Sequence, residues 1–466
     1  MVVGAPDYGT AGEKEVQGHA YVYKRDDSSN EYEMIQEFAG FHTDSDNGFD
    51  GFGFAVDMSA DGNTILVAAG SDWYNGGYIR MFKRSDSLSS YEQYVSIHFM
   101  SLPRISDIIR ILFQHRYGSD IFGFGATDYG ENGFARWAAM SPDASYIVGC
   151  EDDYTSSNRL CDVLKDNGTA YTLFQGEINA DDRSEWAGWA KAGGFSEDGS
   201  VMVLASWADD EELGGIRVYQ NNGTAYNVQQ EIWKRCRQMA VTPDGNTMAC
   251  GQPFGGLYDG QGNPGIVWVY SRSDASQNFT LKGSKIQNEN PDRDLDLSST
   301  TFGRSVDMSD DGNTVVVGAM EYWSDHHEGF AVTYKYMGDQ WVHVDEWHGT
   351  HNGDHFGYEV SISGDAQTVA VGSSPAFQDY ENVGTAYLNI YTLSSDDDDD
   401  DDDSDSSFPA YGIALLAVGG VALVAAAVVI TIFTVKGGGI FGSAASQVTQ
   451  GSTQGRGLEM QDPKHN

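Results

Sequence analysis

Hydrophobic and polar positions alternate with a period of two along most of the chain, which is typical of β-strands rather than helices. The alternation recurs in copies. Three segments align without gaps: FGFAVDMSADGNTILVAAG from Phe52, FGRSVDMSDDGNTVVVGAM from Phe302 and FGYEVSISGDAQTVAVGSS from Phe356. Three weaker copies begin at Phe134, Trp189 and Arg235. This internal repetition is the strongest signal in the sequence.

Each copy predicts a strand, a tight turn and a second strand. In the turn Ser-x-Asp-Gly-Asn-Thr, Asp can cap the backbone and Gly can adopt the positive φ that a tight hairpin needs. The β-branched run at 315–317 then predicts a buried strand. Third strands are predicted after a Gly, at 18–23, 77–82, 215–219, 265–270, 329–334 and 384–391. More polar fourth strands are predicted at 32–38 and 341–345.

Four strands in about 50 residues, repeated, are typical of β-propeller blades. We therefore predict an all-β fold over residues 1–395, a β-propeller of about seven four-stranded blades. The first copy starts at its second strand and the last stops after its third strand, near Tyr391. Because a propeller closes by pairing its ends, this domain is expected to be N-terminally incomplete. Its first strand and a signal peptide would lie upstream of Met1.

The Phe-Gly pairs that open the units, with Val-Gly-Ala-Pro at 3–6, resemble FG-GAP repeats, the units of the integrin α-chain propeller. The similarity is closer still to the Ser-x-Asp-Gly-Asn-Thr variety of bacterial and algal surface proteins. This resemblance covers roughly residues 1–395 and implies a cell-surface binding or adhesion domain. Integrin-type units carry calcium in Asp-x-Asp-x-Asp-Gly loops, and the corresponding loops here lack that pattern.

Residues 410–435 contain no charged side chain. At about 1.5 Å per residue, a helix of this length can cross the roughly 30 Å hydrocarbon core of a bilayer. The sequence thus predicts a single-pass membrane protein. Lys436 opens the Gly/Ser/Gln-rich tail 436–466, which is expected to be disordered and cytoplasmic, with the propeller outside the cell. No signal peptide follows Met1, so a tail-anchored protein with a cytosolic propeller remains the alternative.

The chain is strongly acidic, with 27 basic and 69 acidic residues and a formal net charge of −42. Such a surface repels phosphates, which argues against nucleic acid as a partner. Part of the charge is a poly-Asp run within residues 396–409. This run is interpreted as an extended stalk that lifts the propeller off the membrane. It could also concentrate calcium or bind a mineral or a basic polymer.

Residues 96–132 form a possible insertion, because the copies that contain Ser59 and Ser141 are farther apart than any other neighbouring pair. The stretch 96–118 also breaks the acidic composition, with three Arg residues and one Asp. Two interpretations stay open. The stretch is either a translated intron or a real helix inserted on the propeller rim.

One segment has the composition of a calcium loop. Asp44, Asp46 and Asp50 alternate around the turn residue Gly48, and carboxylates in this pattern can wrap a hard cation. The same residues could instead form a polar loop between blades. Calcium is the one cofactor that the sequence suggests.

The four cysteines fall into two pairs. Cys236 and Cys250 flank a predicted hairpin, and Cys150 and Cys161 could bridge neighbouring strands. Two disulfides are expected if the compartment is oxidising, and four buried free thiols if it is not. N-x-T sequons provide possible glycosylation sites at Asn167, Asn222 and Asn278.

No nucleophile elbow, zinc-protease motif, phosphate loop or dinucleotide fingerprint is present, so the protein is not expected to be an enzyme. The predicted function is binding or adhesion to an extracellular protein or glycan. Its ligand would contact aromatic loop residues such as Trp73, Tyr74, Tyr322 and Trp323. The alternatives are a structural cell-wall or mineral-associated protein that uses the poly-Asp run, and a surface hydrolase on a propeller scaffold.

Overall fold

The computed structural model describes residues 1–6, 18–26, 29, 31–40, 51–69, 78–87, 89–101, 120–125, 133–152, 160–179, 189–207, 215–253, 265–287, 300–321, 328–350, 355–373 and 387–393. Within these ranges every regular element is a β-strand. None of them contains a helix capable of crossing a membrane. The predicted stalk at 396–409, membrane helix at 410–435 and tail at 436–466 lie outside the described residues.

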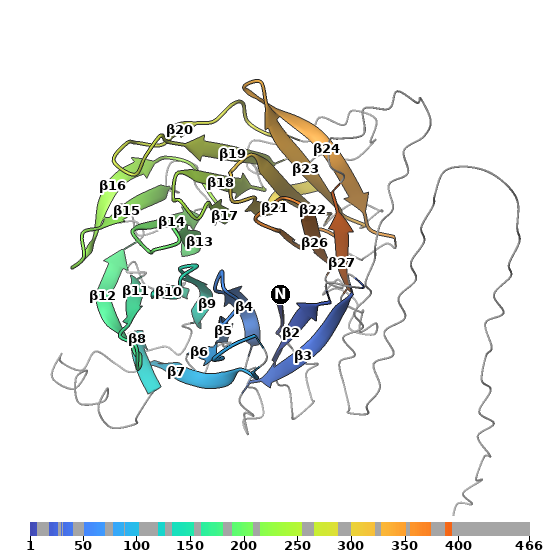
Figure 1. Ribbon diagram of the computed structural model, residues 1–466. Helices are drawn as coiled ribbons and strands as arrows, with labels where there is room; N and C mark the ends of the chain where they lie inside the picture. The colour runs from blue at the N-terminus through green and yellow to red at the C-terminus, as the bar shows by residue number, and fades with distance from the viewer. Residues whose placement is uncertain are drawn as a thin grey trace, which may run out of the picture.

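The described strands form seven sheets arranged as blades around a central axis (Figure 1). The prediction of a seven-bladed, all-β propeller is therefore confirmed. Each blade is numbered in chain order, and its strands are counted outward from the axis. Successive strands of the four-strand repeat are antiparallel neighbours, as expected where short turns connect them.

The strands repeat the same four positions. Those in first position are β4 (Phe52–Met58), β9 (Gly133–Met140), β13 (Trp189–Phe195), β17 (Gln238–Val241), β21 (Thr300–Met308) and β25 (Glu359–Ile362). Those in second position are β1 (Val2–Ala5), β5 (Thr64–Ala69), β10 (Tyr146–Asp152), β14 (Val201–Trp207), β18 (Thr247–Gln252), β22 (Thr314–Glu321) and β26 (Thr368–Ser373). Those in third position are β2 (His19–Arg25), β6 (Tyr78–Lys83), β11 (Leu160–Asp166), β15 (Ile216–Asn221), β19 (Ile266–Ser271), β23 (Phe330–Met337) and β27 (Tyr387–Thr392). Those in fourth position are β3 (Tyr32–Ala39), β7 (Glu92–Ser101), β12 (Tyr171–Asn179), β16 (Tyr226–Ile232), β20 (Thr280–Leu281) and β24 (Gln340–His348).

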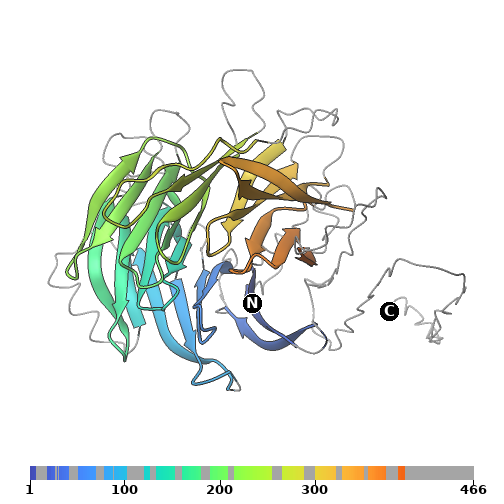
Figure 2. The ribbon, with the colours of Figure 1, turned by 45° about the horizontal axis from the view of Figure 1, so that its top comes forward.

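Blades 1 and 7 are the incomplete ones, as the repeat alignment predicts. Among the described residues blade 1 consists of β1–β2–β3, which occupy positions two to four, and blade 7 of β25–β26–β27, which occupy positions one to three. The two blades lie side by side in both ribbon views (Figures 1 and 2). Arg25 of blade 1 also interacts electrostatically with Asp365 of blade 7. The two ends of the described chain therefore meet in the ring.

Blade 2 differs from the repeat by one additional strand. Strand β8 (Asp120–Gly125) pairs in parallel with β7 at the outer edge of the blade. Residues 96–101, the first part of the possible insertion, continue strand β7 and are not helical. Residues 102–119 and 126–132 lie outside the described part of the chain.

The hydrophobic core lies between neighbouring blades rather than within one sheet. Each cluster of buried residues combines side chains from two adjacent blades. Between blades 1 and 2, for example, Val22 and Phe38 pack with Ile65 and Val67. Strand β5, in second position, is buried on both faces, which explains its continuous apolar sequence.

The Ser-x-Asp turns between first and second strands are stabilised by their own side chains. Ser59 Oγ donates to Asp61 Oδ1 at 2.6 Å and accepts from the Thr64 backbone N–H at 2.9 Å. Gly62 has a φ of 66°, as the turn requires. The corresponding Ser or Thr to Asp hydrogen bonds recur at Ser141, Ser196, Thr242, Ser309 and Ser363.

Backbone hydrogen bonds also join several turns to the turn of the next blade, for example Ala60 N–H to the Pro142 carbonyl at 2.8 Å. We call this end of the propeller, where first strands connect to second and third to fourth, the turn face. The opposite end, where second strands connect to third and each blade connects to the next, is the loop face. All blades share this polarity because their strand order is the same.

Candidate functional site

The predicted ligand residues belong to connections at the loop face. Trp73 and Tyr74 lie in the chain between β5 and β6, and Tyr322 and Trp323 lie between β22 and β23. These four residues are outside the described part of the structure. The strand ends that flank them are equivalent in blades 2 and 6, so both connections start and end on the same face of the ring.

The predicted calcium loop also connects strand ends at the loop face. Asp44, Asp46 and Asp50 lie between β3 and β4, outside the described residues. Within the ranges that the structure does describe, no group of three or more His, Cys, Asp or Glu side chains could hold a metal ion.

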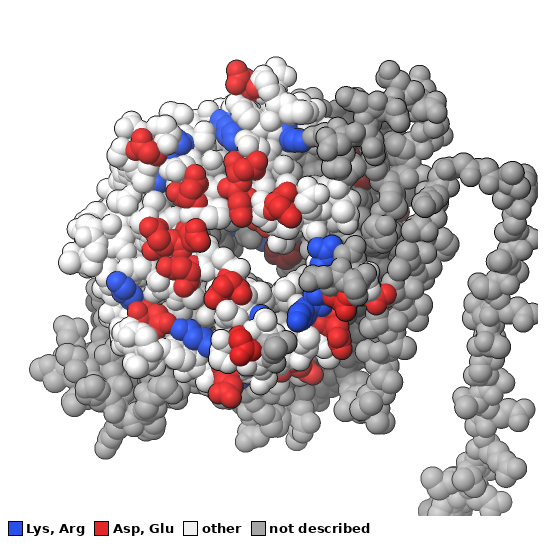
Figure 3. Space-filling model, viewed as in Figure 1, with Lys and Arg blue, Asp and Glu red and all other residues white. Residues whose placement is uncertain are grey.

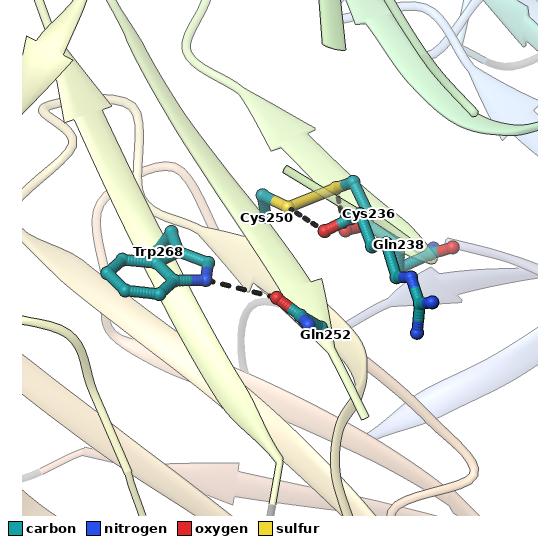
Figure 4. Close-up of a disulfide and its surroundings, with 6 residues drawn as sticks. Cys236, Gln238, Cys250, Gln252 and Trp268 are labelled. Carbon is teal, nitrogen blue, oxygen red and sulfur yellow. Dashed lines mark hydrogen bonds between the residues drawn. A yellow bond between two sulfur atoms is a disulfide. The ribbon is translucent and has the colours of Figure 1, made fainter. Parts of the chain in front are cut away.

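The structure brings both cysteine pairs together. Cys150 and Cys161 are direct partners in the register of β10 and β11, with an S–S distance of 2.02 Å. Cys236, just before β17, is joined to Cys250 on β18, as Figure 4 shows. Exposure of the four side chains is at most 2%. Each pair therefore links neighbouring strands inside the core.

The three sequons lie on exposed turns between the third and fourth strands of blades 3, 4 and 5. Asn167 Oδ1 accepts a hydrogen bond from Thr169 Oγ1 at 2.8 Å, and Asn222 Oδ1 accepts one from Thr224 Oγ1 at 2.8 Å. Asn278 precedes β20 at the equivalent place. All three asparagines are thus at the turn face, opposite the predicted ligand residues.

Acidic side chains lie around a hollow at the propeller axis in the view of Figure 3, and several basic side chains lie at its rim as well. The innermost hairpins contribute the Asp of each turn. The hydrogen bond from Ser59 lowers the pKa of Asp61, and the Asp311 pKa is lowered as well, through hydrogen bonds that outweigh its burial. Since these carboxylates are bonded within their own turns, their first role is structural.

Two aspartates farther along the axis join neighbouring blades. Asp57 on β4 accepts the backbone N–H of Met140 in the next blade at 2.9 Å. Asp307, at the equivalent position on β21, accepts the N–H of Ile362 in blade 7 at 2.9 Å. Burial, together with repulsion from Asp307, raises the pKa of Asp57 to about 6. Because these residues belong to blades 2 and 6, they interact across the axis.

The Phe-Gly pair of the repeat creates a β-bulge in the first strand. In blade 6 Phe302 pairs with Ala319 and Ser305 pairs with Gly318, so Gly303 and Arg304 bulge out of the ladder. Gly303 has a φ of 84°, a conformation that side-chain-bearing residues avoid. A bulge changes the direction of the side chain that follows. In blade 6 the bulge places Arg304 five positions before Ser309 of the turn, and the aligned copies in blades 2 to 7 have an equivalent position.

We call the residues at this position the bulge ring. They are Phe54, Arg136, Lys191, Arg237, Arg304 and Tyr358. The Arg304 guanidinium lies 4.5 Å from the ring centroid of Tyr358 in the neighbouring blade. Burial raises the pKa of Glu359, and Arg304 and Arg237 partly offset that rise. These residues are not among the predicted site residues, although four of the aligned copies carry Lys or Arg at this position.

Together these features define the protein as a seven-bladed β-propeller with a polar, charged axis. No family model matches the sequence. No curated protein matches it either.

Among solved structures, a candidate 6-phosphogluconolactonase from Bacteroides fragilis aligns at 11% identity and a TM-score of 0.47 over 84% of this chain and 90% of the other. A protein from Lactobacillus plantarum aligns at 12% identity and a TM-score of 0.49 over 84% and 92%. Hydrazine synthase from Kuenenia stuttgartiensis aligns at 11% identity and 0.43 over 72% and 76%. At these values the likeness is one of general shape, and no activity is carried over from it.

Proposed function

We propose that this protein is a single-pass membrane protein whose propeller binds an extracellular protein or glycan through its loop face. The observation that carries the proposal is the convergence of the second-to-third-strand connections at one end of the ring. Their lengths vary while the flanking strands keep a constant pattern: 6–18, 70–77, 153–159, 208–215, 253–265, 322–329 and 374–386. Variable connections on a rigid scaffold are where binding residues concentrate.

The properties of the turn face also favour the loop face as the binding surface. Its turns are short, bonded to themselves and, in several blades, to each other, so they leave little freedom to adapt to a partner. The three exposed sequons also lie there, so attached glycans would leave the loop face open. The paired cysteines and the uncharged segment 410–435 fit a domain that is exported and then anchored.

The test is to express the full chain behind a host signal peptide and probe intact cells with a panel of glycans and matrix proteins. Antibody staining of intact cells should detect the propeller. Substituting Trp73, Tyr74, Tyr322 and Trp323 by Ala should weaken binding of the ligand at least tenfold, as expected for aromatic anchors. Asn222→Gln on the turn face is the matched control and should bind as the wild type does.

Two outcomes would contradict the proposal. One is a propeller that stays on the cytosolic side of the membrane. The other is binding that survives the loop substitutions. If replacement of the poly-Asp run by Gly and Ser abolished surface attachment while the loop variant kept it, the structural wall or mineral role would be favoured instead.

A further inference from the structure

Blade 7 has a sheet edge that is covered in the other six blades. In blades 1 to 6 the third strand pairs with a fourth strand on its outer side, whereas β27 is the outermost described strand of blade 7. Leu393, just after β27, donates its N–H to the Gln367 carbonyl on the inner side at 2.9 Å. Because backbone groups alternate in direction along an antiparallel strand, those of Leu388, Ile390 and Thr392 point outward, where a fourth strand lies in the other blades.

The fourth strands of the other blades bring an aromatic anchor with them. An aromatic residue stands at or next to the start of each: Tyr32, Tyr91, Tyr171, Tyr226, Phe279 and Trp341. In blades 2 to 6 this side chain packs into the core shared with the preceding blade. Among the described residues, the core between blades 6 and 7 receives no such side chain from blade 7.

The anchor also has a polar contact at its own turn. In blade 4 Tyr226 Oη donates to the carbonyl of Gly199, the turn residue with positive φ, at 2.6 Å. Tyr91 and Tyr171 make the same bond in blades 2 and 3, and basic side chains supply the donor in blades 5 and 6. The equivalent residue in blade 7 is Ala366, whose carbonyl receives no hydrogen bond from the described part of the chain.

At three junctions a glutamine of the preceding blade holds the backbone of the anchor. Gln230 in blade 4 donates its Nε2 to the Phe279 carbonyl at 3.0 Å and accepts the Phe279 N–H at 2.7 Å. Gln36 and Gln175 form the same two bonds with the anchors of blades 2 and 4. These glutamines lie four positions after the anchor of their own strand, and in blade 6 that position is Asp345.

Asp345 is half-buried and faces the junction with blade 7 without a donor. No described residue gives its carboxylate a hydrogen bond. Burial raises the pKa of Asp345, and only the charge of His343 opposes the rise. A backbone N–H from a fourth strand of blade 7 would supply the missing donor, and hydrogen bonds to a carboxylate are among the stronger ones.

The residues that directly follow β27 do not suit the vacant position. Every residue from Asp396 to Asp403 is aspartate, which is depleted in strands and repels its own kind. Thr392 is at the turn-face end of β27, and the run begins four residues later. A fourth strand would start at this same end. A segment with basic residues ahead of its aromatic anchor is therefore complementary to it in charge.

We propose that the outer edge of β27 binds an extended segment of a partner protein, in which basic residues precede a tyrosine, as the fourth strand of blade 7. The tyrosine ring enters the core between blades 6 and 7, its hydroxyl donates to the Ala366 carbonyl, and its N–H donates to Asp345. The residues after it pair with β27 through main-chain hydrogen bonds. The site goes beyond the proposed function, because it lies at the outer edge of one blade and not at the loop face.

The probe is a capped peptide in which lysines precede the blade 4 sequence AYNVQQEI, residues 225–232. Fluorescence anisotropy of the labelled peptide, titrated with the full-length protein in detergent at low salt, measures its affinity. Replacing the peptide's tyrosine by Ala should weaken binding at least about tenfold, and by Phe several-fold, since Phe loses only the hydroxyl. Serines in place of the lysines, or added salt, should weaken it as well.

Variants of the protein locate the binding edge. Asp345→Ala should weaken binding about tenfold, whereas Asp345→Gln, which installs the side chain used at three other junctions, should bind the peptide. Thr392→Pro removes an outward N–H without breaking the inner ladder and should also weaken binding. Glu33→Ala is the matched control. It removes an exposed carboxylate from β3, in a blade that has its fourth strand, and should leave the affinity unchanged.

The proposal is overturned if the peptide does not bind, or if a scrambled peptide of the same composition binds equally well. Asp345→Ala behaving like Glu33→Ala would overturn it too. Self-association of the protein that Asp345→Ala abolishes would show a second copy at this edge instead. If Asp345→Ala does not fold, the peptide variants still decide. The loop-face alanine variant should keep its affinity for the peptide, which separates this test from that of the proposed function.

Discussion

Asp57 should make the propeller less stable as the pH rises, and Asp57→Asn should remove that dependence. Burial, with repulsion from Asp307, raises the pKa of Asp57 from 3.8 to about 6 in the folded protein. The carboxyl therefore holds its proton more tightly when the protein is folded. Its favourable contribution is complete below pH 3.8 and is lost as the pH rises through 6. At 1.36 kcal/mol per unit, the full effect is about 3 kcal/mol.

The substitution also removes an acceptor. Asp57 accepts the backbone N–H groups of Met58 and Met140 through separate oxygens, and Asn retains only one oxygen. Loss of one such hydrogen bond costs about 1 kcal/mol. Relative to the wild type, Asp57→Asn should thus be destabilised by about 1 kcal/mol near pH 3.5 and stabilised by about 2 kcal/mol near pH 7.

Urea unfolding of both proteins between pH 3.5 and 7 measures this difference, and subtracting the wild type removes the titration of the other carboxyl groups. Asp61→Asn is the matched control in the same blade. The hydrogen bond from Ser59 lowers the pKa of Asp61, so its contribution is present at neutral pH and lost as the pH falls. The control should therefore destabilise the protein most near pH 7. A difference for Asp57→Asn that stays constant across this range would refute the reasoning.

Three shorter predictions follow from the same structure. Ala366 has a φ of 56°, so Ala366→Gly should raise the thermal midpoint by relieving about 1 kcal/mol of strain, while Gly312→Ala, at a φ of 66°, should lower it. Replacing Cys236 and Cys250 by Ser should destabilise protein made in an oxidising compartment by about 3 kcal/mol in chemical unfolding. Thiol labelling of the unreduced wild type should be negligible. When the chain is exported, Asn222→Gln should remove one glycosidase-sensitive step in gel mobility.

The fold was predictable because the same turn and the same apolar strand recur in the repeats and can be recognised in the sequence. The Ser-x-Asp turn forms from neighbouring side chains, and the second strand reads as a continuous apolar run. The third strand of blade 3 was not predicted. Strand β11 begins at Leu160 without the Gly that marks the other third strands, and its pairing with β10, for example Cys161 opposite Cys150, determines its structure. A strand that is determined by its pairing with a neighbouring strand need not show a recognisable pattern in its own sequence.

The axial residues could not be located from the sequence for a different reason. Asp57 and Asp307 lie in copies far apart in the chain, and they face each other only because the ring brings blades 2 and 6 to opposite sides of one axis. The Phe-Gly pair served as a mark of the repeat, while its structural role is to form the bulge that redirects residues such as Arg304. That role depends on a positive φ at Gly303, which the backbone shows and the alternating pattern does not.

The repeat also separates what the fold needs from what is free to vary. Ser, Asp and a residue with positive φ recur in the turns because each hairpin requires them, and two turns tolerate Ala at the positive-φ position, Ala144 and Ala366. The residue in the bulge has no such constraint, and there the copies range from Phe54 to Arg304. Since the copies in blades 2 to 7 share this position in the repeat, differences among the copies become differences from blade to blade. The positions that differ among the copies therefore determine the chemistry of the axis, and the positions that are the same in all copies maintain the fold.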